Sequence, residues 1–423
     1  MTDSHFNTMP KLRFTDFDGA WAKNSSSIRI VAGKAYPLHM YGDSGALLVQ
    51  GQNIFPNELK IDQPTYIPEK HLSEKDAWLK IHDILLGLNR PLLGKKLKAC
   101  LYLESQEAVL YQRAGKLIFN RKEIESAFLF HYLFSQPFTK QLLLELVGSD
   151  QPYIKSDLFK VTRNFFPTLP EQQKIANFLS SVDKRIEQLT QKKSLLEQYK
   201  KGVMQQLFTQ KIRFKDDDGG DFPDWEEKKL GEVAHPTKKW SFTGGPFGSN
   251  LKSEDYTEKG IRIIQLQNIG DGRFHDDYKI YTSEVKATEL LSCNIYPGDL
   301  ILSKMGDPVA RACIIPDYQK RYVMCSDGIR LAIDQSKFAS YFIFSQINHR
   351  IFRHRAIRVS TGSTRKRIGL NDLKRLTIKA PSLPEQTKVA NFFSALDRKI
   401  ETVASQIAEM QTFKRGLLQQ MFV

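Results

Sequence analysis

Apolar residues recur at alternating intervals of four and three along two long stretches, residues 169–208 and 383–422. Each stretch begins with Leu-Pro-Glu-Gln and contains no further proline or glycine before Gly202 or Gly416. Proline suits the first turn of a helix, and a glutamate there faces the positive end of the helix dipole. The pattern therefore predicts two long helices, each with a narrow apolar seam that requires a partner.

The seam continues through both helices with few polar interruptions. Lys193 interrupts the first copy, and Lys200 and Lys414 occupy the same slot in the two copies. We expect the helices to form an antiparallel coiled coil that holds two globular parts at a fixed separation. The alternative is that each helix packs on its own domain as an ordinary core helix. The predicted seam consists of Ile175, Leu179, Val182, Ile186, Leu189 and Leu196 in the first helix, and Val389, Phe393, Leu396, Ile400, Val403, Ile407 and Met410 in the second.

The two helical stretches are copies of one another. They align without a gap at an offset of 214 residues, and 17 of 40 positions are identical. Shorter segments repeat in the same order before each helix: Lys-x-Arg-Phe at residues 11 and 211, a tryptophan at 21 and 225, and Gln-Asn-Ile at 52 and 267. A repeat of half the chain length indicates a duplicated half-molecule with pseudo-two-fold symmetry, because solenoid repeats are only about 20–50 residues long.

The region before each helix has a mixed pattern. Short β-rich runs, such as residues 46–50 and 261–266, are separated by glycine, proline, asparagine and aspartate. Apolar helical stretches follow at 124–134 and 338–352. The predicted fold class is α/β or α+β, with two globular domains and two long helices. The predicted domains are residues 1–168 and 211–382, and the predicted spacer helices are 169–210 and 383–423.

The charge composition indicates which class of partner the chain could bind. The net charge is +15; residues 1–210 contain 28 basic and 21 acidic residues, and residues 211–423 contain 34 and 26. The positive charge is therefore shared by both halves, as expected if both face a polyanion, although an ordinary basic protein has the same composition. The four cysteines show neither disulfide nor zinc spacing, and the sequence contains no signal-peptide core or membrane-spanning apolar run. We expect a cytoplasmic protein without a membrane partner.

Motifs for catalysis are missing from the sequence. It has no G-x-x-x-x-G-K-[ST] phosphate loop, no G-x-G-x-x-G after a strand, no H-E-x-x-H and no Asn/Asp-Pro-Pro-aromatic segment. We therefore predict that the chain is not an enzyme and that it binds no metal or cofactor. A stand-alone nuclease or fused methyltransferase is an alternative, as is a coiled-coil scaffold with no nucleic-acid role.

Residues 350–367 are the strongest candidate for nucleic-acid binding. They contain seven Lys or Arg residues and no acid, and such a density of charge can neutralise phosphates, although a plain cationic helix face has the same pattern. The first half is not basic at the equivalent place, so its predicted cationic surface is residues 89–98. The predicted DNA-binding residues are Arg350, Arg353, Arg355, Arg358, Arg365, Lys366, Arg367, Lys304 and Arg311 in the second half, and Arg90, Lys95, Lys96, Gln151 and Tyr153 in the first.

Three of these patterns resemble one known family. The doubled L-P-E-Q-x-K-[IV]-A-N-F helix, Gly-Ser-Thr-Arg-Lys-Arg-Ile-Gly-Leu-Asn-Asp-Leu-Lys at 362–374 and Gly-Pro-Phe-Gly-Ser at 245–249 are similar to the conserved regions of specificity subunits of type I restriction–modification enzymes. The resemblance covers essentially the whole chain. The first half departs from it most, because Gly-Ser-Asp-Gln-Pro-Tyr-Ile replaces Gly-Ser-Thr-Arg-Lys-Arg-Ile.

The resemblance implies a non-catalytic subunit. In this family each recognition domain reads one half of a bipartite site in double-stranded DNA, and the helices set the spacer between the halves. Two methyltransferase subunits supply S-adenosylmethionine chemistry at adenine N6, and two ATP- and Mg-dependent restriction subunits can join. A methylation-only or type IIB-like system without a separate translocase is the alternative. The sequence does not give the DNA letters or the spacer length.

Overall fold

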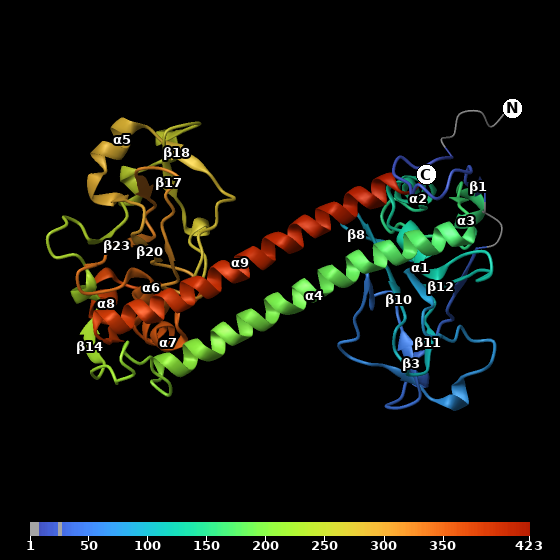
Figure 1. Cartoon of the computed structure of the whole chain (residues 1–423), viewed down its shortest axis with the longest axis horizontal. Coiled ribbons are helices and arrows are strands. Elements are labelled where there is room, and N and C mark those ends of the chain that lie inside the picture. Colours follow the sequence, from blue (N-terminus) through green and yellow to red (C-terminus); the bar gives the residue numbers. More distant parts are fainter. Residues whose placement is uncertain (1–7, 24–27) are drawn as a thin grey trace. The chain divides into compact units, whose positions relative to one another are not determined.

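The computed structural model describes residues 8–23 and 28–423 (Figure 1). The chain divides into two compact units. The first unit is Met1–Gln191 with Ala404–Val423, and the second unit is Lys192–Val403. The long helices α4 (Leu169–Phe208) and α9 (Leu383–Gln420) each contribute one end to each unit.

The first unit contains two sheets with the four-stranded order β10-β7-β12-β2 and the three-stranded order β11-β3-β6. The four-stranded sheet is antiparallel throughout, whereas β11 runs parallel to β3. Short helices and a two-stranded pair, β1 with β13, cover one end. The bounds are β1 Ala22–Lys23, β2 Arg29–Ala32, β3 Ala46–Val49, β4 Ile54–Phe55, β5 Glu58–Leu59, β6 Tyr66–Ile67, β7 Ile84–Gly87, β8 Leu92–Leu93, β9 Lys96–Leu97, β10 Ala99–Leu101, β11 Ala108–Leu110, β12 Ala114–Ile118, β13 Phe165–Phe166, α1 Ser126–Tyr132, α2 Gln136–Glu145 and α3 Leu158–Val161.

The second unit repeats this topology. Its sheet β15-β23-β20-β21 corresponds to β2-β12-β7-β10, and β17 pairs parallel with β22 as β3 does with β11. Strands β16 and β19 extend the second sheet. The bounds are β14 Glu226–Lys229, β15 Phe242–Gly244, β16 Tyr256–Thr257, β17 Ile261–Ile264, β18 Ile280–Thr282, β19 Asn294–Ile295, β20 Leu300–Ser303, β21 Ala312–Ile314, β22 Tyr322–Met324, β23 Gly328–Leu331, β24 Thr377–Ala380, α5 Glu284–Glu289, α6 Ser340–Asn348, α7 Arg350–Val359 and α8 Leu370–Arg375.

The glutamine of each Leu-Pro-Glu-Gln segment ties a long helix to its unit. Gln172 is buried, its side-chain oxygen accepts the N–H of Glu125 at 2.9 Å, and its side-chain nitrogen donates to the carbonyls of Glu123 and Pro167. Gln386 makes the equivalent bonds to Ala339, Lys337 and Pro381. Because buried amides require partners, these bonds fix where each helix starts.

The far end of each helix lies in the other unit. Phe422 packs against Trp21 and Phe128 in the first core, and Phe208 packs against Trp225 and Phe342 in the second. The first core therefore contains the start of α4 and the end of α9, and the second contains the reverse. The two helices are packed together and run antiparallel, and the predicted fold class is confirmed. The alternative of a helix packed only on its own domain is wrong, because each helix serves two cores.

The predicted seam positions lie on the less exposed side of each helix. Eight of them are buried: Ile175, Leu179, Val182, Leu189, Val389, Phe393, Leu396 and Val403. Ile186, Leu196, Ile400, Ile407 and Met410 are half-buried. The predicted helical stretch 338–352 is interrupted, because His349 has an extended backbone and separates α6 from α7.

Candidate nucleic-acid interface

One loop has the same backbone framework in both units. In the first unit, Val147 and Tyr153 exchange backbone hydrogen bonds around Gly148, whose φ is 92°. In the second unit, Thr361 and Arg367 do the same around Gly362, whose φ is 97°. Glycine adopts this left-handed conformation without the steric cost that a Cβ brings, so the turn requires the glycine that both loops share.

Each loop lies beside the end of the central strand of its sheet. In the first unit the N–H of Arg90 donates to the carbonyl of Pro152 at 2.7 Å, and in the second the N–H of Gly306 donates to Lys366 at 3.1 Å. Strand β7 is thereby joined to Gln151 and Tyr153, and strand β20 is joined to Arg365–Arg367. In each unit, two segments that are far apart in sequence therefore meet: Arg90 with Pro152, and Gly306 with Lys366.

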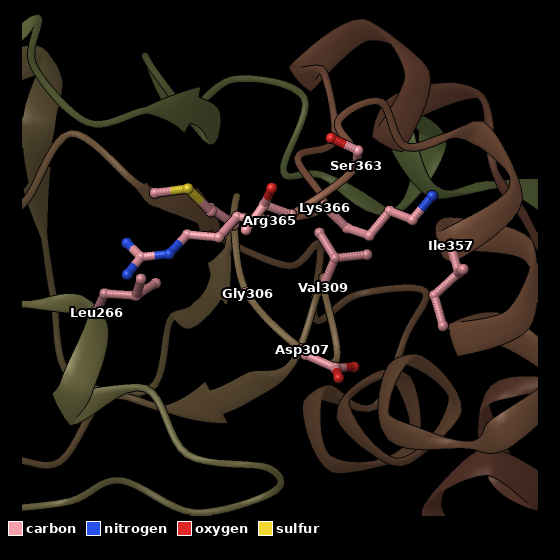
Figure 2. A pocket seen from close by; sticks show the side chains of 10 residues that line it. Leu266, Gly306, Asp307, Val309, Ile357, Ser363, Arg365 and Lys366 are labelled. Carbon is pink, nitrogen blue, oxygen red and sulfur yellow. The ribbon is translucent and has the colours of Figure 1, made fainter.

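A pocket of about 630 Å³ opens beside the second-unit loop (Figure 2). Its apolar lining comes from Leu266, Val309 and Ile357, whereas Arg365 and Lys366 are exposed at its edge. In Figure 2 the Arg365 side chain extends toward Leu266 and the Lys366 side chain toward Ile357. Cations beside an apolar hollow can contact phosphate while leaving room for a base edge or methyl group. The full lining is Leu266, Met305, Gly306, Asp307, Val309, Ile357, Ser363, Thr364, Arg365 and Lys366.

Three of the predicted DNA-binding arginines instead bind protein atoms. Arg353 is only 6% exposed, and its guanidinium donates to the carbonyl of Val309 and pairs with Asp271. Burial lowers the pKa of Arg353 to about 10. Arg311 donates to two carbonyls of the loop that follows β17, and Arg355 donates to the carbonyl of Thr377 at 2.9 Å. These side chains are engaged within the unit, so they are poor candidates for phosphate contacts.

The other predicted residues of the second unit lie nearer the surface. Arg350 and Arg358 are exposed on α7, Arg365 and Lys366 are exposed on the loop, and Lys304 is half-buried. Arg367 is also exposed but pairs with Asp327 at 2.9 Å. The exposed set is therefore smaller than the basic run in the sequence indicates, because helix α7 turns Arg353 inward.

In the first unit, all five predicted residues are exposed. Lys95 and Lys96 lie on the hairpin formed by β8 and β9. This hairpin follows Arg90, whose backbone N–H donates to Pro152 in the loop that carries Gln151 and Tyr153. Arg90 has a φ of 45°, whereas the equivalent Gly306 has a φ of 129°. A side chain in the left-handed region is disfavoured, and such residues concentrate at functional sites. Arg90 and Gly306 therefore occupy equivalent positions, each with a positive φ and a backbone bond to its loop, but only Arg90 carries a side chain.

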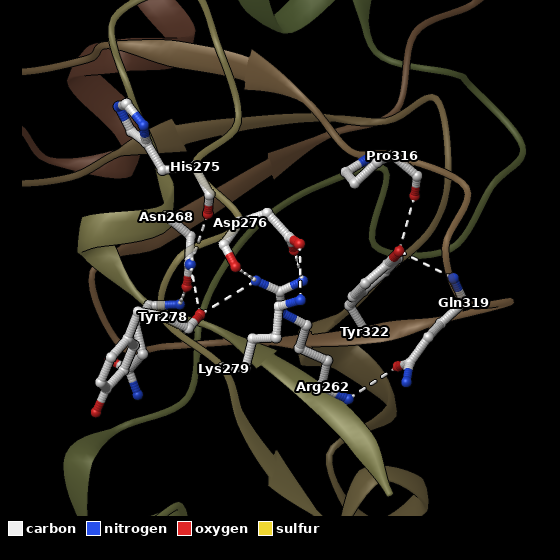
Figure 3. Close-up of polar contacts among 10 residues, drawn as sticks. Arg262, Asn268, His275, Asp276, Tyr278, Lys279, Pro316, Gln319 and Tyr322 are labelled. Carbon is white, nitrogen blue, oxygen red and sulfur yellow. Dashed lines mark hydrogen bonds and ion pairs between the residues drawn. The ribbon is translucent and has the colours of Figure 1, made fainter. Parts of the chain in front are cut away.

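Sequence reasoning did not identify Arg262, a buried cation at the edge of the second-unit core (Figure 3). Arg262 lies on β17, at the position that Leu47 occupies on β3 of the first unit. Its guanidinium pairs with Asp276 and donates to the carbonyl of Tyr278 at 3.1 Å. Asn268 donates to the same carbonyl at 2.8 Å. Together they hold residues 268–279 in place. The repeated Gln-Asn-Ile was a sequence signal for Asn268, because the equivalent Asn53 donates to the carbonyl of Lys60.

A buried carboxylate–cation pair also recurs in the two units. Asp299 accepts Arg330 at 2.7 Å, and Asp83 accepts Lys116 at 3.0 Å. Burial raises the pKa of Asp299, while Arg330 opposes that rise. A shifted carboxyl can indicate catalysis, but this one is engaged by its cation in both copies, so the pair is structural. Within residues 8–23 and 28–423, no group of three or more His, Cys, Asp or Glu residues could hold a metal ion, and no helix could cross a membrane.

Comparison with known proteins identifies the family. The model of the type I restriction modification DNA specificity domain matches residues 74–198 and 223–412. The chain is 35% identical over 190 residues to the type I restriction enzyme MjaVIII specificity subunit of Methanocaldococcus jannaschii; the match covers 44% of this chain and 45% of that subunit. The chain thus matches less than half the length of this relative.

Two solved structures share the fold. The S subunit of a type I restriction-modification system from M. genitalium has a TM-score of 0.58 at 15% identity, covering 98% of this chain and 99% of that one. A chain from a study of complex assembly and conformational transition of the type I R-M system has a TM-score of 0.54 at 18% identity, covering 93% and 97%. Because the family model covers most of the sequence in two copies, the chain belongs to the family of type I restriction–modification DNA specificity subunits.

Proposed function

We propose that this chain is the non-catalytic DNA specificity subunit of a type I restriction–modification complex and recognises a bipartite site in double-stranded DNA. The observation that carries the proposal is the duplicated loop beside β7 and β20. Its closing backbone hydrogen bonds are the same in both units, but the loop presents Gln151 and Tyr153 in one unit and Arg365 and Lys366 in the other. A shared frame with different side chains suits two modules that read different sequences.

The proposed domains are recognition domains at residues 1–168 and 211–382 and spacer helices at 169–210 and 383–423. The proposed DNA contacts are the exposed cations of the two loop regions, with Arg350 and Arg358 of α7; Arg353, Arg311 and Arg355 are left out. The protein would act in the cytoplasm, where chromosomal DNA is accessible.

Two methyltransferase subunits are the proposed partners, joined by two restriction subunits in a complete complex. S-adenosylmethionine, ATP and Mg would bind those partners, which methylate adenine N6 and cleave DNA. Equivalent exposed aromatic residues, Tyr199 on α4 and Phe413 on α9, support docking of two copies of one partner. An assembly that methylates without a restriction subunit is the second form of the proposal.

Methylation mapping tests this function. The chain is co-expressed with its methyltransferase subunit, and modified adenines are located by single-molecule sequencing with and without this gene. We expect one motif with two specified parts separated by an unspecified spacer. A continuous motif, or methylation that does not depend on this chain, would contradict the proposal.

Deletion of residues 192–198 from α4 tests the role of the helices. Seven residues correspond to about 10.5 Å of helix. We expect a different spacer or loss of activity, with the specified letters of both half-sites unchanged. Changed half-site letters would show that the helices are not the ruler. Deletion of residues 399–405 from α9 in the same chain keeps the two helices equal in length and is the matched comparison.

A further inference from the structure

A polar junction in the second unit joins three helices. The ammonium group of Lys200 on α4 contacts both carboxylate oxygens of Asp397 on α9, at 2.5 and 2.7 Å. The hydroxyl of Tyr341 on α6 donates to the same carboxylate. The side chains of Lys200 and Asp397 are 25% and 27% exposed. The end of α4, which starts in the other unit, is therefore bound to this one by a directional contact as well as by apolar packing.

The first unit has the equivalent junction. Lys414 on α9 contacts Asp183 on α4 at 2.5 and 2.7 Å. The Asp183 carboxylate lies 3.9 Å from Nδ1 of His131 on α1, whose other ring nitrogen is 3.3 Å from the hydroxyl of Ser180. As in the second unit, the lysine lies at the end of the helix that starts in the other unit, here α9. The aspartate lies on the helix that starts in the same unit, here α4.

The two junctions are equivalent by duplication, because Asp397 and Lys414 are Asp183 and Lys200 shifted by 214 residues. In an antiparallel helix pair the numbers of facing residues have a constant sum, and each junction gives 597, since 183 faces 414 and 200 faces 397. A slip by one heptad keeps the apolar seam positions of the two helices opposite one another, but it separates each lysine from its aspartate and shifts Phe422 and Phe208 within their cores. It would also move one helix by about 10.5 Å along the other, close to three base pairs at 3.4 Å per base pair.

We propose that the Lys200–Asp397 and Lys414–Asp183 pairs set the register of α4 against α9 and are therefore positioning residues for the spacer of the DNA site. The inference rests on the proposed function. Apolar seams are non-directional, and the seam of this chain is weakened at three lysine positions. Polar groups at single seam positions are known to specify register at some expense of stability, because a slipped state leaves partly buried charges without partners.

The test uses four combinations of substitutions in the complete methyltransferase complex. Asp183→Lys with Asp397→Lys places like charges at both junctions in the native register. Adding Lys200→Asp and Lys414→Asp restores opposite charges with inverted polarity. A third chain carries Lys200→Met, Lys414→Met, Asp183→Leu, Asp397→Leu and Tyr341→Phe, which together remove the polar junctions without charge repulsion. Lys193→Glu is the control, because Lys193 pairs with Glu197 of its own helix at 2.9 Å.

Methylated sites are mapped for each complex, and folding is followed by urea unfolding of each chain. We expect the like-charge chain to lose methylation at the native spacer by at least about tenfold, since breaking such pairs is strongly unfavourable. The inverted pairs should return both rate and spacer to those of the unmodified chain. The apolar chain should fold at least as stably and methylate sites with more than one spacer, an outcome that a purely stabilising role would not produce.

The results separate this inference from the proposed function. If the unmodified complex does not methylate a bipartite site, the function is wrong. If it does, but the folded like-charge and apolar chains both retain a single native spacer and rate, the register proposal is overturned. If the like-charge chain does not fold, the apolar chain is the test. Methylation by its complex only at sites with the native spacer would then overturn the proposal.

Discussion

Arg13 and Glu171 form a two-pronged ion pair, with nitrogen–oxygen distances of 2.8 and 2.7 Å, and the indole N–H of Trp21 donates to the same carboxylate. Arg213, Glu385 and Trp225 form the equivalent group in the second unit. Both carboxylates are almost fully buried. The glutamate of Leu-Pro-Glu-Gln therefore does more than face the helix dipole, because it holds the N-terminal segment of each half against its long helix.

Glu385→Gln should destabilise the second unit by about 3 kcal/mol, the scale on which removal of one buried charged partner acts. Arg213 and Trp225 would lose a charged acceptor that is inaccessible to water. Urea unfolding measures the loss, and Glu401→Gln on the exposed side of α9 is the matched control, expected to change stability by less than about 0.5 kcal/mol. Equal effects of the two changes would show that the buried pair adds no net stability.

Arg365→Ala and Lys366→Ala should each weaken DNA binding and lower the salt slope of log K by roughly one unit, if each neutralises one phosphate. Titration of the methyltransferase complex with DNA at several salt concentrations measures both quantities. Arg367→Ala should act in the same direction, with the added loss of the Asp327 pair.

Arg353→Ala provides the contrasting case on the neighbouring helix. Because Arg353 is buried and bound to Val309 and Asp271, its removal should reduce the stability of the second unit while leaving the salt slope unchanged in the folded fraction. A salt slope that falls as much as for Arg365→Ala would show that Arg353 reaches DNA after all.

Ile400→Asp should impair assembly with the methyltransferase by placing an unpaired charge in the half-buried seam. Lys399→Asp, an exposed neighbour, changes the charge by more but should leave assembly intact. Size-exclusion chromatography of each chain with its partner measures the difference. An intact complex with Ile400→Asp would mean that the predicted seam register is wrong.

Stability should fall as the pH drops below about 6.5, the ordinary pKa of an unfolded histidine. Burial and the nearby Lys414 lower the pKa of His131 to about 3, so between these values the unfolded chain binds the proton and the folded chain does not. The loss from this group is about 2 kcal/mol at pH 5. Urea unfolding between pH 5 and 8 measures the slope, and His131→Gln should reduce it. His349 has a pKa lowered to about 4 and contributes in the same direction.

Much of the fold follows from sequence because its signals are local or repeated. The seam spacing predicts the two long helices, and the offset of 214 residues predicts two equivalent halves. The candidate site is less predictable. Charge density identifies the run at 350–367, but it does not distinguish the exposed Arg350 and Arg358 from the buried Arg353 on the same helix. The inward side of α7 is fixed by packing against Val309 and Asp271, which lie far away in the chain.

By itself, the sequence determined the duplication, the helical periodicity and the basic character of both halves, since each depends on residue types at fixed spacing. Only the tertiary structure decided that the two helices exchange their ends between units and that Lys200 meets Asp397 while Lys414 meets Asp183. It also decided which arginines are exposed and which are bound to other groups of their own unit. These outcomes depend on long-range packing and on desolvation, which join residues that no local pattern connects.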